Sequence, residues 1–185
     1  MNKPKPFSFT GYAREYGTFV GFLWTITFVA YAQGIQQNLN SFLILLSVLL
    51  MLASMVLVFM LAYRFRTKLP ENINMKYFMS YIFSLQMLMF ACLFSGLLEF
   101  CYLTLIDKGQ MIATLHDLLN QSQVTTVYRD MGMSDVLSQI RHQLEELAAL
   151  TPLQLTLLIF NQNFMMSLFF AAIVALIVRK KNKQP

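Results

Sequence analysis

Four stretches of the chain are long and apolar enough to cross a lipid bilayer, and they restrict the fold more than any other feature. They extend over residues 17–35, 41–63, 77–106 and 152–178. A helix of about 20 apolar residues crosses the hydrocarbon core of a bilayer. Only 12% of the 185 residues are charged, against about a quarter in ordinary soluble domains. The sequence therefore predicts an all-α, polytopic protein with four transmembrane helices in a single membrane domain, in contact with the lipid bilayer.

The composition changes abruptly between the third and fourth apolar stretches, in residues 107–151. Two groups of apolar residues recur there at the spacing of amphipathic helices, and polar residues 121–133 separate them. The first group is Met111, Ile112, Leu115, Leu118 and Leu119, and the second is Val136, Leu137, Ile140, Leu144 and Leu147. We therefore expect a helical hairpin outside the bilayer, with a loop at 121–133. Its apolar faces would lie against each other, against the membrane surface or against a second copy of the chain.

Two short motifs concern the first and last apolar stretches. Gly17 and Gly21 are four residues apart, a spacing that lets helix backbones approach closely in membranes. Thr151 followed by Pro152 and Gln154 predicts the start of the last helix. Threonine can cap a helix, proline suits the first helical position, and glutamine at the third position can bond back to the cap.

The distribution of Lys and Arg predicts the orientation in the membrane. The segment before the first stretch carries three, the connection after the second carries four, and the C-terminal tail carries four. Residues 107–151 carry three, and the connection after the first stretch carries none. Because basic residues favour the cytoplasmic side, both termini are expected in the cytoplasm and residues 107–151 outside it. The main topology anchors are Arg64, Arg66, Lys68, Arg179, Lys180 and Lys181. Basic residues grouped at the ends of apolar stretches are a membrane pattern and not a nucleic-acid-binding face.

Glu99 is the acid within the predicted transmembrane helices, and such residues are functional-site hypotheses by default. On a helical wheel it shares a small and polar stripe with Ser95 and Tyr102, which neighbouring helices would cover. Asn163 and Asn161 of the last stretch lie at a similar depth, so both are candidate partners. We consider three roles for this intramembrane polar cluster: a structural lock in which a protonated Glu99 bonds to an amide, a proton or cation site, and a contact for lipid or another small ligand.

Motifs for catalysis and metal binding are missing from the sequence. His116 and His142 lie in the predicted hairpin without an HExxH or paired ExxH pattern, so we expect no metal. No nucleophile elbow, phosphate-binding loop or dinucleotide fingerprint is present, and we expect no cofactor.

The layout resembles a family of unknown function made up of four-span bacterial membrane proteins, typical of Bacteroidetes. The resemblance rests on Tyr16-Gly17-x-x-x-Gly21, on Tyr102-x-x-x-Ile106-Asp107 at the end of the third stretch, on the intervening helical segment, and on Pro152 before a last stretch that ends in Arg-Lys-Lys. It implies a location in the bacterial inner membrane. It implies no established activity and no catalytic residue.

Three functional hypotheses follow. The leading one is a non-enzymatic interaction or assembly component that contacts a protein partner, or a second copy, through residues 107–151. The alternative is a small transporter or ion-coupled subunit that uses Glu99 with Asn161 or Asn163. A membrane-lipid enzyme is the third.

Overall fold

A computed structural model describes residues 8–69 and 75–179, and this part of the chain is helical, with no β-strand. The elements are α1 (Phe9–Gln36), α2 (Ser41–Lys68), α3 (Tyr77–Tyr102), the π-helix η1 (Leu103–Asp107), α4 (Gln110–Leu119), α5 (Ser122–Asp130), α6 (Ser134–Ala148) and α7 (Pro152–Val178). Four helices are long and apolar enough to cross a membrane: α1, α2, α3 continued by η1, and α7. The predicted all-α architecture with four candidate transmembrane helices is confirmed.

The long helices extend beyond the predicted apolar stretches where local caps and helix-forming residues allow it. α1 begins at Phe9 because the Ser8 hydroxyl accepts the Gly11 N–H at 3.1 Å and caps the first turn. α2 continues through the basic residues to Lys68. At the start of α7 the predicted capping box is confirmed: Thr151 accepts the Gln154 N–H, and the Gln154 side chain accepts the Thr151 N–H.

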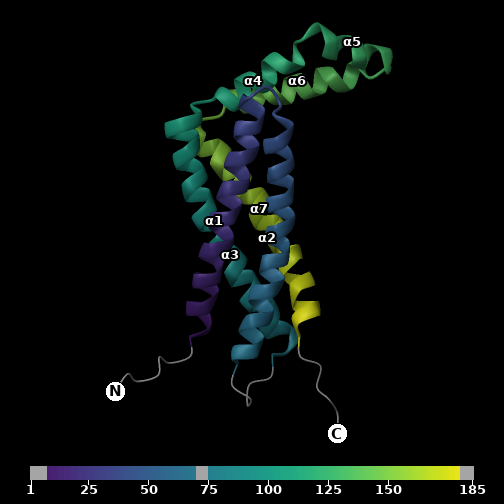
Figure 1. Ribbon diagram of the computed structural model, residues 1–185. Coiled ribbons are helices and arrows are strands. Elements are labelled where there is room, and N and C mark those ends of the chain that lie inside the picture. Colours follow the sequence, from purple (N-terminus) through teal and green to yellow (C-terminus); the bar gives the residue numbers. More distant parts are fainter. Residues whose placement is uncertain (1–7, 70–74, 180–185) are drawn as a thin grey trace.

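The four long helices form a bundle in which α3 packs against both α1 and α7, and α2 packs against α1 (Figure 1). α1 and α3 approach most closely at Gly17 and Gly21. A Cβ atom on Gly17 would lie 2.4 Å from the Met87 carbonyl oxygen, and one on Gly21 would lie 2.7 Å from that of Ala91. The glycine pair therefore serves a helix contact within the chain.

One end of the bundle, which we call the terminal end, contains the start of α1 and the end of α7 (Figure 1). An aromatic cluster fills it. Phe65 of α2 stacks on Phe83 of α3 with ring centroids 3.7 Å apart, and Phe9 meets both rings edge-on at 5.4 Å. Phe65 and Phe83 are fully buried, so this end is held by apolar packing.

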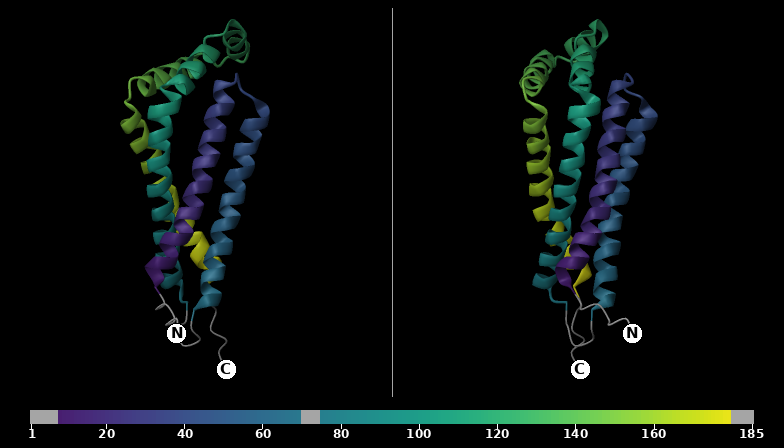
Figure 2. Two further views of the ribbon diagram at one scale, coloured as in Figure 1. Left: turned by 60° about the vertical axis from the view of Figure 1, so that its left-hand side comes forward. Right: turned by 90° about the vertical axis from the view of Figure 1, so that its left-hand side faces the viewer.

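Helices α4, α5 and α6, which we call the insertion, lie across the opposite end of the bundle, the insertion end (Figure 2). α4 packs against α6 and also against α1, while α5 packs on α4 and α6. The loop predicted at 121–133 is wrong, because residues 122–130 form α5. The hydroxyls of Thr125 and Thr126 donate back to carbonyls of the preceding turn. Val124, Val127 and Met131 recur at i, i+3 and i+7, a helical spacing that the loop prediction did not take into account.

Candidate functional site

Glu99 lies in the interior of the bundle, on the face of α3 that the wheel predicted. Ser80, Ser84, Ala91, Ser95, Glu99 and Tyr102 are all buried. Only 2% of the Glu99 surface is exposed, and its Oε2 atom has no hydrogen-bond partner among the described residues. A buried polar atom without a partner is unusual in native structures and calls for an explanation.

The predicted amide partners do not bond to Glu99 in the structure. Asn161 is exposed and Asn163 is half-buried on α7. The Asn163 carbonyl accepts the Ser167 hydroxyl at 2.7 Å, and that hydroxyl lies 3.5 Å from the Cys92 sulfur. Ser95 donates to the Cys92 carbonyl at 3.3 Å. The polar contact between α3 and α7 thus runs through Cys92 and Ser167, and the predicted Glu99–amide lock is not formed.

A chain of hydrogen bonds crosses from α1 to α3 and η1 at the insertion end. Gln33 Nε2 donates to the Tyr102 hydroxyl at 2.8 Å and to Gln36 Oε1 at 3.2 Å. Gln36 Nε2 in turn donates to Asp107 Oδ1. Asp107 also accepts the N–H groups of Gly109 at 2.9 Å and Met111 at 3.1 Å. Although 99% buried, this carboxylate therefore has partners on both of its oxygens.

Asp107 ends a short π-helix, η1, and leads into a tight turn before α4. π-Helical turns are rare and occur frequently at functional sites. In the turn, Lys108 has φ +49° and Gly109 has φ +85°, so both adopt the left-handed conformation that few side chains tolerate. Asp107 accordingly fixes the direction in which the insertion leaves the third transmembrane helix.

An open cavity of about 600 Å³ lies between this turn and the junction of α6 with α7. We call it the groove. Its apolar lining includes Leu103 of η1, Ile112 of α4 and Leu155 of α7, and its charged lining includes Lys108, Asp117 and Glu145. Pockets of this size are typical of small-molecule sites, and the mixture of apolar and charged walls suits an amphiphilic ligand.

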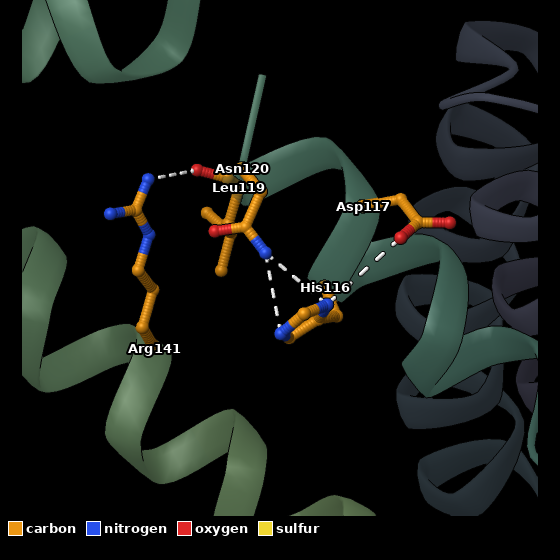
Figure 3. A network of polar contacts seen from close by, with 5 residues as sticks. All are labelled: His116, Asp117, Leu119, Asn120 and Arg141. Carbon is orange, nitrogen blue, oxygen red and sulfur yellow. Dashed lines mark hydrogen bonds and ion pairs between the residues drawn. The ribbon is translucent and has the colours of Figure 1, made fainter. Parts of the chain in front are cut away.

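The insertion is fixed internally by Arg141 of α6. Its Nη2 atom donates to the Leu119 carbonyl at 2.6 Å, at the end of α4 (Figure 3). The same atom donates to the Thr125 hydroxyl at 2.9 Å, in α5. A basic side chain on the last carbonyls of a helix also complements the helix dipole. Arg141 therefore joins all three helices of the insertion.

Each of the two histidines lies near an acidic residue of its own helix. His116 lies beside Asn120, at 3.2 Å, and beside Asp117, at 3.9 Å (Figure 3). His142 Nδ1 lies 3.4 Å from Glu146. Within residues 8–69 and 75–179, no three His, Cys, Asp or Glu side chains gather closely enough to hold a metal ion.

The comparison with protein families matches residues 15–180 to a family described as a protein of unknown function, DUF4199. The chain belongs to this family. No curated protein and no solved structure matches it. Membership in DUF4199 agrees with the resemblance drawn from the sequence and assigns no activity to any residue of the site.

The predicted topology anchors that the structure describes lie at the terminal end, where two of them also make contacts. Arg66 Nη1 donates to the Val178 carbonyl at 3.0 Å and so caps α7. The Lys68 ammonium lies 4.9 Å from the centre of the Tyr12 ring. Arg64 and Arg179 are exposed, and Lys180 and Lys181 lie outside the described residues.

Sequence reasoning missed the residues that organise the insertion end. Gln33, Gln36, Asp107 and Arg141 make their decisive contacts with other helices, which periodicity within one segment does not reveal. The one available signal was Asp107 itself, an acid at the end of an apolar stretch and two residues before a glycine, which is a common setting for side-chain capping of a turn.

Proposed function

We propose that this DUF4199 protein is a non-enzymatic interaction or assembly component of a membrane, and that it contacts a protein partner through the distal part of its insertion. The distal part comprises residues 122–136, from α5 to the first turn of α6. A second copy of the chain is the simplest partner of this kind, and a different membrane protein is the other.

The observation that carries this proposal is a group of apolar side chains left uncovered on the distal part. The exposed fractions are 48% for Val127, 67% for Met131, 41% for Met133 and 39% for Val136. Val127 and Met131 are four residues apart, so they lie on one side of the helix. Contiguous apolar surface outside the bilayer marks interaction sites, and methionine adapts well to different partner surfaces. Figure 1 shows α5 extending sideways, beyond the bundle.

The proximal part of the insertion is packed and supports the distal part. Met111, Ile112 and Leu144 form one buried cluster with Ile35 of α1 and with Tyr102. Together with the Asp107 and Arg141 hydrogen bonds, this cluster gives α5 a fixed position relative to the bundle. A rigid, pre-positioned contact surface loses less conformational freedom on binding than a flexible one.

The proposed location is a bacterial inner membrane, with both termini in the cytoplasm and the insertion on the other side. The excess of Lys and Arg in the segments at the terminal end supports this orientation under the positive-inside rule. A partner would accordingly meet the insertion outside the cytoplasm.

A transporter or ion-coupled subunit is the second candidate, because Glu99 keeps a buried oxygen without a hydrogen-bond partner. Proton or cation flux through liposomes containing the protein tests it. Transport through the carboxylate requires flux that Glu99→Gln abolishes, whereas equal behaviour of the two proteins removes this candidate.

The leading proposal is tested by purification from native membranes in mild detergent. We compare the intact protein with a Met131→Ser, Met133→Ser double variant and with a Gln139→Ser, Gln143→Ser control, which changes two exposed polar residues of the insertion outside the distal part. A stoichiometric partner, or a dimer, should accompany the intact protein and the control and be lost from the methionine variant. Equal recovery with all three proteins, or no partner with any, contradicts the proposal.

A further inference from the structure

We propose that the groove binds the headgroup of a phospholipid that carries both a phosphate and a primary ammonium group, the chemistry of phosphatidylethanolamine. This site is separate from the distal contact surface and does not depend on it.

The position of the groove places it where lipid headgroups lie. Its apolar wall includes Leu103 and Leu155, which belong to two helices that are apolar and long enough to span the membrane. Leu155 lies in the first turn of α7, and Leu103 begins the last turns of the third transmembrane helix. The opposite wall is formed by the insertion. A molecule in the groove would therefore contact the ends of two candidate transmembrane helices on one side and the insertion on the other.

The surface next to the groove continues as apolar side chains suited to acyl chains. Leu153 and Leu157 of α7 are 55% and 56% exposed, and Leu105 and Ile106 of η1 are 68% and 61% exposed. Leu157 lies farther into α7 than Leu155, and Leu105 and Ile106 belong to the same short π-helix as Leu103. Acyl chains of a bound lipid would cover them without entering the bundle.

The charged groups of the groove match a headgroup with two opposite charges. Lys108 lies on one helix connection and Glu145 on α6, and neither has an ion-pair partner in the part of the chain that the structure describes. Lys108 can hold a phosphate as a point charge. Glu145 and Asp117 can each accept a hydrogen bond from a primary ammonium group, which has three donors.

Asp107 also lines the groove, but its oxygens are already engaged by Gln36, Gly109 and Met111. It therefore positions Lys108 and α4 and does not bind the headgroup itself. The lining then offers the ligand Lys108, two acids and His116, whose Nδ1 atom lies 3.9 Å from Asp117 Oδ1. The two acids disfavour an anionic headgroup without an amine. A quaternary ammonium lacks the N–H donors that Glu145 and Asp117 would bind.

The test is native mass spectrometry of the full-length protein after exchange into mixed micelles that contain one lipid at a time. The probes are phosphatidylethanolamine, phosphatidylcholine and phosphatidylglycerol with identical acyl chains. We compare Glu145→Gln with Glu146→Gln, a neighbouring exposed acid that pairs with His142 and does not line the groove. Lys108→Asn removes the cation while keeping a residue that tolerates positive φ.

We expect phosphatidylethanolamine to be retained best. Glu145→Gln and Lys108→Asn should each reduce its retention roughly fivefold, the scale of one partly exposed ion pair, while Glu146→Gln retains it fully. Ala148→Trp, which fills the groove, should reduce the retention of all three lipids. Equal retention of the three lipids, or retention that Glu145→Gln and Lys108→Asn leave unchanged, overturns the proposal. Circular dichroism identifies any variant that fails to fold. If a charge variant fails to fold, the loss of lipid retention in Ala148→Trp tests the groove independently.

Discussion

The two ends of the bundle are built from different chemistry. At the terminal end, the Phe65–Phe83 stack and the close approach of Gly17 to α3 leave little space and few polar contacts. At the insertion end, the same helices are joined by Gln33, Gln36, Tyr102 and Asp107, followed by a π-helix and an open groove. Polar groups and irregular backbone beside a groove are suited to recognition of a ligand. We therefore propose that the terminal end mainly stabilises the bundle and that the insertion end carries the binding role.

The largest effect is expected from breaking the glycine contact. Gly17→Ala places a methyl group 2.4 Å from the Met87 carbonyl oxygen, and overpacking of this kind costs about 1–3 kcal/mol or more. The matched control is Gly96→Ala, whose new methyl would meet Phe160 at an ordinary 3.5 Å. That variant should be neutral or gain up to about 1 kcal/mol from helix propensity. Reversible unfolding in detergent measures the stability of both variants. Equal stability would show that the contact between Gly17 and α3 does not stabilise the bundle.

Asp107→Ala should lower the free energy of unfolding slightly less than Gly17→Ala does, and it should act at the insertion end. It removes the acceptor of three hydrogen bonds, and buried donors left without an acceptor cost about 1–3 kcal/mol. Hydrogen exchange should rise in α4 and η1 while α2 stays protected. Asp117→Ala, which changes an exposed acid of α4, should leave hydrogen exchange in α4 and η1 unchanged. An equal loss of protection in α2 would show that the effect of Asp107→Ala is not confined to the insertion end.

Arg141→Met is expected to loosen the insertion alone. The side chain donates to Leu119 and Thr125, and losing these bonds costs about 1–2 kcal/mol. Limited proteolysis should cleave faster between residues 119 and 134, with the bundle intact. Arg129→Met, which changes an exposed basic residue of α5, is the control and should be cleaved at the rate of the unmodified protein.

The smallest effect on stability is expected at Glu99. Because Oε2 makes no hydrogen bond, Glu99→Met loses no partner and removes a costly buried polar group. Unfolding free energy should stay the same or rise by up to about 1 kcal/mol. A loss of more than 2 kcal/mol, as a rough threshold for breaking a buried pair, would show that Glu99 has a structural partner after all.

The sequence predicted the features that depend on neighbours along the chain. The four apolar stretches, the Thr151–Gln154 capping box and the buried stripe around Glu99 all follow from composition and helical spacing, and the structure contains them. The stripe identified which face of α3 is covered. It did not identify what covers it. The Asn161 and Asn163 partnership was inferred from depth and from the faces of the last stretch, and it is not formed.

The features that sequence reasoning missed depend on contacts between distant segments. Gln36 and Asp107 are 71 residues apart, and neither belongs to a periodic pattern. The π-helix replaces an α-helical turn without a change in composition. In each case tertiary packing decides the outcome, which local propensity does not encode.

Site-specific photo-cross-linking in native membranes tests the central claim, that the insertion end makes a protein contact, most directly. A cross-linking residue at Met131, which is 67% exposed, samples the distal part of the insertion. One at Leu93, which is 55% exposed, samples the outer surface of the candidate transmembrane helix α3. We predict a protein adduct of discrete mass from Met131, either a dimer or a complex with one partner, and none from Leu93. Lipid adducts alone at Met131, or the same protein adducts at both positions, would contradict the claim.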